Sequence, residues 1–211
     1  MAQPLQNPTS ATARFAGNLA LAALLLANCS YAVYSSPGEG LDFWDAVVGL
    51  AITAFLVVNV LRRPDPVEQD SRWWVWIVCA ASLFYFFAFQ AGGGREGGWQ
   101  WLAYCVMLLR HLAGAVGCLL LGISFSLMPA RRQVRVGWPY SMVRHPIYAA
   151  YIIGDACFVV LVPSLWNATV WAAGALLFAW RAKLEERVLR HDEGYAEYRG
   201  RTPWRFLPGI Y

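Results

Sequence analysis

The chain has 211 residues, of which 58% are hydrophobic and 14% are charged, and its mean hydropathy is +0.41. Soluble chains carry roughly 25% charged residues and disordered chains are poor in aromatic side chains, whereas this chain has 11 Trp, 10 Tyr and 11 Phe. The composition therefore excludes disorder and argues against an ordinary soluble globule, and the net charge of +4 suggests anionic lipid headgroups as partners and no nucleic acid.

Runs of about 20 apolar residues are typical of membrane-spanning helices. Four such runs occur in the first part of the chain: Phe15–Tyr34, Phe43–Leu61, Trp73–Ala91 and Trp101–Leu127. A fifth apolar stretch, Ile147–Trp180, is interrupted by Pro163-Ser164, and a proline there predicts a helix break. The sequence thus predicts an all-α, polytopic integral membrane bundle of about four full transmembrane helices and a Pro-broken helical hairpin, with a cytoplasmic C-terminal cap.

The basic residues predict the orientation of this bundle, because Lys and Arg favour the cytoplasmic side of a membrane. All of the 17 basic residues except Arg95 and Arg110 lie before the first run, between the second and third, between the fourth and fifth, or in the tail. We therefore expect a multi-pass protein of the bacterial inner membrane, in contact with the lipid bilayer and with both termini in the cytoplasm.

Two charges fall within the apolar runs, Arg110 in the fourth and Asp155 in the fifth. Such charges usually pair with each other or line a polar cavity. We expect Arg110 and Asp155 to face each other or to share a water-filled pocket, with His111 nearby. A structural ion pair is favoured over a site for a substrate headgroup, and both interpretations stay open.

Other motifs carry no chemistry. The glycine-rich stretch Gly92–Gly98 lacks the preceding strand that a phosphate-binding loop needs, so it is interpreted as a connector. The five cysteines lie in apolar stretches without a C-x-x-C pair, which favours neither a metal site nor a disulfide framework, and no metal is expected.

Polar residues of catalytic type concentrate after position 130, so the chain is divided into N-terminal transmembrane helices, 1–130, and a cofactor-binding catalytic region, 131–211. Pro146 suits the first position of a helix, where its missing N–H costs nothing. Arg144 and His145 then lie at a helix N-terminus, which attracts anions. Taken alone, this dipeptide is better explained as a snorkelling Arg and an interfacial His without a functional role.

A second polar group follows the last apolar stretch. Glu185 and Glu186 point roughly 100° apart on a helix, so at most one of them can face the core squarely. Gly194 is predicted to end this helix. The tail beyond it is too aromatic for a solvated end and is predicted to form an ordered lid. Its aromatic residues are Tyr195, Tyr198, Trp204, Phe206 and Tyr211.

Together these groups resemble a known family, the isoprenylcysteine carboxyl methyltransferases and related membrane phospholipid methyltransferases. The resemblance lies in an ordered set of short motifs between Val136 and Pro208, about a third of the chain: Pro139-Tyr140, Arg144-His145-Pro146-Ile147-Tyr148, Glu185-Glu186, Tyr195-x-x-Tyr198 and Arg205-Phe206-Leu207-Pro208. Trp138 before Pro139 and the stretch Thr202-Pro203-Trp204 depart from the family pattern.

The resemblance implies an enzyme that binds S-adenosylmethionine in a pocket formed by the last helices and closed by the tail. It would transfer a methyl group to a lipophilic small molecule or lipid, with a carboxylate as the expected acceptor. The catalytic residues implied are Arg144, Arg205 and Glu186. The residues implied to bind the cofactor are Tyr140, His145, Pro146, Tyr148, Glu185, Glu186, Tyr195 and Tyr198.

Three alternatives remain at this point. A phospholipid or amine N-methyltransferase would differ in its acceptor and would need a general base, for which His145 is the candidate. A sterol or isoprenoid reductase with a similar C-terminal pattern would use NADPH. A non-catalytic membrane scaffold would bind neither cofactor.

Overall fold

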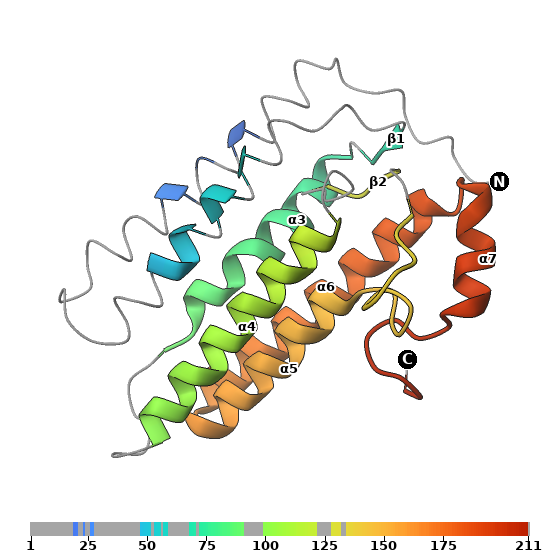
Figure 1. Cartoon of the computed structure of the whole chain (residues 1–211). Helices are drawn as coiled ribbons and strands as arrows, with labels where there is room; N and C mark the ends of the chain where they lie inside the picture. Colours follow the sequence, from blue (N-terminus) through green and yellow to red (C-terminus); the bar gives the residue numbers. More distant parts are fainter. Residues whose placement is uncertain are drawn as a thin grey trace.

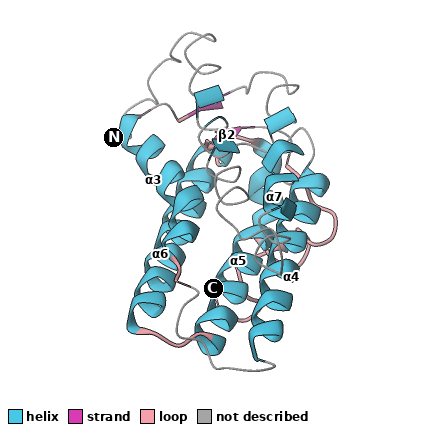
Figure 2. Ribbon diagram, turned by 90° about the vertical axis from the view of Figure 1, so that its left-hand side faces the viewer, coloured by secondary structure: helices cyan, strands magenta, loops and turns pink. Residues whose placement is uncertain are grey.

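A computed structural model describes residues 68–70, 72–90, 99–121, 128–131 and 134–210, together with scattered helical residues between 19 and 58. The elements bounded in this part of the chain are β1 (Glu68–Gln69), α3 (Trp73–Phe84), the 3₁₀ helix η1 (Tyr85–Ala88), α4 (Trp99–Leu121), β2 (Ala130–Arg131), α5 (Pro146–Leu161), α6 (Leu165–Leu189) and α7 (Glu193–Arg201). The helices α3, α4, α5 and α6 run side by side (Figure 1). Since α3 packs on α6, α6 on α5, and α5 on α4, the order across the bundle is α3–α6–α5–α4 (Figure 2).

The predicted membrane bundle is wrong, because no helix within the described residues is long and apolar enough to cross a membrane. The helix α3 has 12 residues and α5 has 16. Both are shorter than the roughly 20 residues that a helix needs to cross a bilayer. The 25 residues of α6 include the charged run Arg181–Arg187. The predicted location as a multi-pass protein of the bacterial inner membrane, with both termini cytoplasmic, is wrong for the same reason. The first apolar run lies mostly, and the Gly92–Gly98 connector wholly, outside the described residues, and the second run is described only in part.

The predicted break at Pro163-Ser164 is confirmed, since α5 ends at Leu161 and α6 begins at Leu165. Ser164 caps α6, and its Oγ accepts a hydrogen bond from the Asn167 N–H at 3.0 Å. Pro146 occupies the first turn of α5, as expected. These stop and start signals place the beginning of α5 and the end of α6 at the same end of the bundle.

Asn167 joins the opposite end of the bundle, and sequence reasoning did not single it out. Its side chain is fully buried and exchanges two hydrogen bonds of 3.0 Å with the backbone of Gln90, just after η1. The same amide donates to the Val162 carbonyl at 3.1 Å. One side chain therefore satisfies backbone groups of both the α5–α6 turn and the end of η1.

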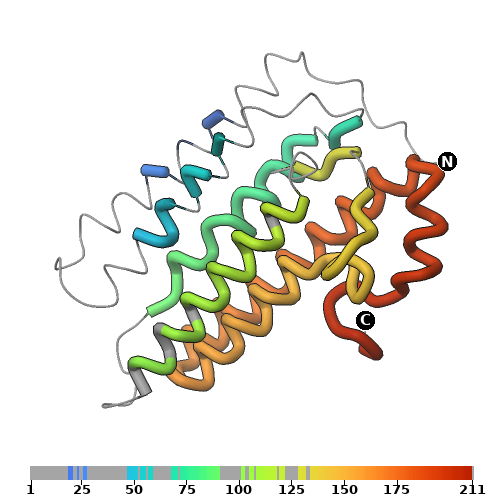
Figure 3. Tube along the Cα trace, in the orientation of Figure 1, coloured from blue at the N-terminus to red at the C-terminus, as the bar shows by residue number. Residues whose placement is uncertain are grey.

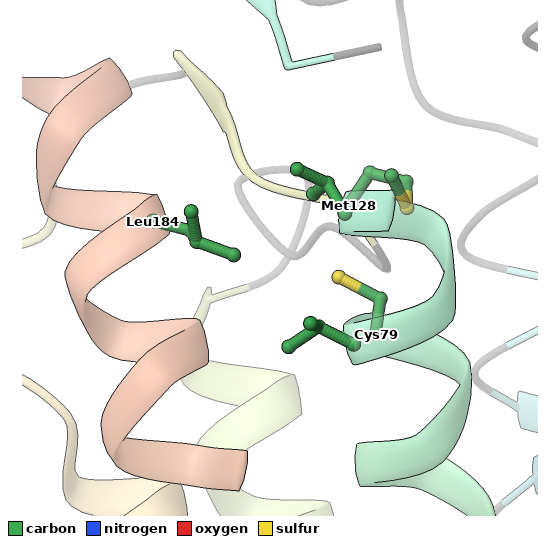
Figure 4. Close-up of a cluster of buried hydrophobic side chains, with 5 residues drawn as sticks. Cys79, Met128 and Leu184 are labelled. Atoms are coloured by element: carbon green, nitrogen blue, oxygen red, sulfur yellow. The ribbon is translucent and has the colours of Figure 1, made fainter. Parts of the chain in front are cut away.

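A buried apolar cluster fixes α6 against α3 (Figure 4). Its members come from α3, from the chain before β2 and from the end of α6: Val75, Val78, Cys79, Met128 and Leu184. Full burial of a side chain of this size contributes about 1.5–3 kcal/mol. Because Leu184 directly precedes Glu185 and Glu186, this packing also sets where the two glutamates lie. The β1–β2 ribbon, antiparallel with Glu68 opposite Arg131, lies at this end.

The chain after α6 turns back onto the bundle. Gly194 does not end a helix, which corrects the prediction: α6 ends at Leu189, and Gly194 lies in the first turn of α7. The reason is Asp192, whose carboxylate accepts a hydrogen bond from the Gly194 N–H at 3.0 Å and caps α7.

Beyond α7 the tail runs beside the loop that leads into α5 (Figure 3). The N–H groups of Arg144 and His145 each donate to the tail, to the carbonyls of Trp204 and Arg205, at 2.9 Å. The predicted order of the tail is confirmed through Ile210, while Tyr211 lies outside the described residues. Its role as a lid stays a prediction.

Candidate functional site

Two segments, the loop before α5 and the C-terminal tail, converge on the Glu186 carboxylate of α6, which is only 1% exposed. From the loop before α5, Arg144 Nη1 lies 3.0 Å from Glu186 Oε1. From the tail, Arg205 donates through Nε to Oε1 at 3.0 Å and through Nη2 to Oε2 at 2.9 Å, a bidentate pair. His145 Nε2 lies 3.3 Å from Oε1. The backbone pairing of the loop with the tail is what brings these residues together.

The charges in this cluster determine the ionisation of Glu186. Burial opposes the charged carboxylate, but hydrogen bonds from His145 and Arg205 and the charge of Arg144 outweigh burial and lower the pKa of Glu186 to about 2. The hydrogen bond to Glu186 in turn raises the pKa of Arg205. Glu186 is therefore a permanent anion at physiological pH, held by two permanent cations.

His145 lies between both glutamates. While Nε2 faces Glu186, Nδ1 lies 3.6 Å from Glu185 Oε2. Glu186 is buried and Glu185 is half-buried, consistent with their different directions on the helix. Both carboxylates still contact the imidazole of His145, because the ring has one nitrogen facing each of them. This contact restricts the orientation of the imidazole.

Tyr148 extends the site one turn into α5. Its hydroxyl donates to Glu185 Oε1. Its ring lies parallel to the His145 ring, with centroids 5.5 Å apart, and stacks at 5.0 Å on Phe178 of α6. Burial raises the pKa of Tyr148, so the phenol remains a neutral hydrogen-bond donor.

The other three predicted tyrosines form a separate buried cluster, Tyr140, Tyr195 and Tyr198. The Tyr198 hydroxyl donates to the Tyr140 carbonyl at 2.8 Å, and the Tyr140 hydroxyl donates to the Gly117 carbonyl of α4 at 3.2 Å. Through these bonds they attach α7 to the loop and the loop to α4. The structure therefore divides the predicted site residues into a charged group around Glu186 and an aromatic group that holds α7 in place.

Two polar atoms are buried beside the charged group. They are the Tyr195 hydroxyl and Arg144 Nε, and a side-chain hydrogen bond and the charge of Arg144 both act on Tyr195. Burial raises the pKa of Tyr195, so its hydroxyl stays protonated. A buried guanidinium next to a neutral phenol suits a ligand carboxylate.

Arg110 and Asp155 form a second buried ion pair, with Arg110 Nε 2.5 Å from Asp155 Oδ1. The predicted pairing is confirmed, but it lies in the protein interior between α4 and α5. Tyr85 of η1, which sequence reasoning missed, donates its hydroxyl to Asp155 and accepts from Arg110 Nη2 at 3.4 Å. The guanidinium lies 4.5 Å from the ring centroid of Phe86. Burial raises the pKa of Asp155, and the Arg110 charge opposes this rise.

Glycines on three helices make room for this second cluster. A Cβ on Gly154 would lie 2.9 Å from Arg110 Cβ, and a Cβ on Gly174 or Gly114 would come within 3.0 Å of the Tyr85 or Tyr151 ring. Real Cβ atoms essentially never approach so closely. Glycine at these positions is therefore required for the side chains around Arg110 to pack as they do.

Within the described residues, no group of three or more His, Cys, Asp or Glu side chains could hold a metal ion. No protein-family model matches the chain, and no curated protein sequence matches it.

Proposed function

We propose that the chain is an S-adenosylmethionine-dependent methyltransferase that methylates a lipophilic acceptor, with a carboxylate as the acceptor group. The observation that carries the proposal is the convergence of Arg144, His145 and Arg205 on the buried Glu186. These residues come from three separate motifs of the resembling family, and nothing in their sequence spacing obliges them to meet. Chance would more readily leave them on solvated surfaces.

The charged group has the chemistry that such a cofactor needs. Arg144 or Arg205 would bind a carboxylate, since Glu186 is one anion shared by two arginines. Glu185, half-buried at the end of α6, would accept hydrogen bonds from the ribose or amino group. When bound, the cofactor supplies an activated methyl group, and the residues of the chain orient the reactants and exclude water.

The surroundings of His145 favour a carboxylate as the acceptor. Both ring nitrogens face glutamate oxygens, at 3.3 and 3.6 Å, so the imidazole is engaged as a positioning group. An amine acceptor would need a general base with a nitrogen directed at the substrate. A carboxylate acceptor needs no base, because it is already the nucleophile.

The test is a thermal-shift panel on the purified chain with S-adenosylmethionine, S-adenosylhomocysteine and NADPH. A ligand at 100 times its Kd adds about 2.7 kcal/mol to the free energy of unfolding. The proposal predicts stabilisation by the first two and none by NADPH. Stabilisation by NADPH alone would identify a reductase, and stabilisation by none would favour a non-catalytic protein.

Two variants sharpen this test. Arg205→Gln should abolish the cofactor-induced shift, because it removes the bidentate contact with Glu186 and one candidate carboxylate ligand. Arg187→Gln, on the exposed side of the same helix end as Glu186, is the matched control and should keep the full shift. Equal shifts in both variants would remove Arg205 from the site.

A further inference from the structure

Arg181 is a buried cation that no motif of the site includes. It is only 3% exposed, although it lies where α6 changes from an apolar to a charged sequence and could have reached solvent. Burying an arginine costs several kcal/mol unless each donor finds a partner. Its partners therefore indicate why the side chain is held inside.

Two of these partners belong to different layers of the bundle. Arg181 Nε donates to Glu185 Oε1 at 3.1 Å, one helical turn further along α6. Arg181 Nη1 donates to Ser82 Oγ on α3 at 2.9 Å, and Ser82 Oγ donates to the Cys79 carbonyl at 2.8 Å. Ser82 is itself buried, at 3% exposure. The guanidinium is thus fixed at one end by the backbone of α3.

The Glu185 carboxylate is oriented by this arrangement. Its Oε1 accepts from both Arg181 and the Tyr148 hydroxyl, which leaves Oε2 facing His145 Nδ1. The Arg181 guanidinium also lies 5.6 Å from the Tyr148 ring centroid. Without Arg181 the glutamate would lose the contact that selects which oxygen faces the histidine.

We propose that Arg181 is a positioning residue for the candidate site, anchored on α3 by Ser82, which fixes the Glu185 carboxylate between Tyr148 and His145. The chain before residue 130 thereby contributes to the site through Ser82. The effect on ligand affinity rests on the proposed function, whereas the effect on His145 does not.

The experiment compares Ser82→Ala and Arg181→Lys with the wild type. Lysine keeps the charge but lacks the planar fork that reaches Glu185 and Ser82 together. Thr169→Ala is the control, because Thr169 makes the same kind of helical hydroxyl-to-carbonyl hydrogen bond, to Leu165 at 2.8 Å, on the exposed face of α6. The ¹⁵N chemical shifts of the two His145 ring nitrogens, assigned with His145→Gln, report the ring's tautomer and hydrogen bonds without any ligand.

Both variants should change the His145 shifts, while Thr169→Ala leaves them as in the wild type. Ser82→Ala should also weaken S-adenosylmethionine binding about tenfold by calorimetry, the equivalent of one hydrogen bond to a charged group. Wild-type His145 shifts in both variants would overturn the positioning role, whatever the affinity. Altered shifts with no binding of S-adenosylmethionine by the wild type would instead keep the positioning role and reject the methyltransferase.

Discussion

The two buried ion clusters of this protein are built on opposite plans. The Arg110–Asp155 pair matches one cation with one anion inside the bundle, and Tyr85 bridges the pair. The Glu186 cluster assembles two arginines and a histidine on one carboxylate, from a loop, a helix end and the tail.

This difference is the one we expect between a structural ion pair and the proposed binding site. The balanced pair is enclosed by helices whose glycines leave room for it, and the charges of Arg110 and Asp155 neutralise each other inside the bundle. The second cluster has an excess of positive charge, and the Arg205 side chain retains 13% exposure at its edge. A buried excess of one charge is costly for stability alone and is useful for holding a ligand of the opposite charge.

The largest expected effect concerns the buried Arg110–Asp155 ion pair. Arg110→Leu or Asp155→Leu should each lower the free energy of unfolding by about 3–5 kcal/mol, because each leaves a buried charge without its partner. The double variant should recover much of the loss. Denaturant unfolding measures all three, with the exposed pair Arg201–Glu197, 76% and 67% exposed, as a control that should change little. Strictly additive losses would mean that Arg110 and Asp155 do not interact.

The second prediction concerns pH and the Glu186 cluster. Because the pKa of Glu186 is lowered from 4.5 to about 2, its charge stabilises the folded state above pH 4.5, and this contribution is lost as the pH falls through about 2. Glu186→Gln should therefore be less stable than the wild type at pH 7, by up to about 3 kcal/mol. The difference should shrink between pH 4.5 and pH 2, whereas Glu197→Gln should show no such convergence. A constant difference across this range would contradict the assigned ionisation.

A smaller effect should follow from filling one of the glycine positions. Gly174→Ala would place its Cβ against the Tyr85 ring and should destabilise by about 1–3 kcal/mol, the usual cost of overpacking. Gly200→Ala on α7 meets nothing within 4 Å and should be neutral or slightly stabilising, since alanine favours a helix. If thermal unfolding gave equal effects for both, the Arg110 cluster would not depend on close packing.

The smallest effect is expected where the tail is attached. Tyr198→Phe removes the hydrogen bond to the Tyr140 carbonyl and should cost about 1 kcal/mol. Limited proteolysis should cut the tail faster in this variant, and S-adenosylmethionine should slow cleavage in the wild type. Equal cleavage with and without the cofactor would remove the lid role from the tail.

Local signals in the sequence predicted some features well. Pro163, Pro146 and the Arg110–Asp155 pair are confirmed because a proline constrains its own backbone and a buried charge needs a partner. The positions of Glu185 and Glu186 on a helix also predicted that at most one of the two glutamates faces the core. These inferences depend on a few neighbouring residues.

Features that depend on tertiary packing could not be predicted. An apolar run does not reveal whether its face packs on another helix, as Val75 and Val78 do, or continues for the length of a bilayer, and this is where the membrane prediction failed. The burial of Arg181 could not be predicted, because its partner Ser82 lies 99 residues away in the sequence. A single serine in an otherwise apolar helix was the one signal available.

The most direct measurement of the central claim is isothermal titration of the wild type and of Glu186→Gln with S-adenosylmethionine, with NADPH titrated in parallel. The claim is that the Glu186 cluster binds the methyl donor while the Arg110 cluster holds the fold. We expect the wild type to bind S-adenosylmethionine and not NADPH, Glu186→Gln to lose binding while remaining folded, and the Arg110→Leu, Asp155→Leu double variant to retain it. Wild-type affinity in Glu186→Gln, or no binding by the wild type, would contradict the account.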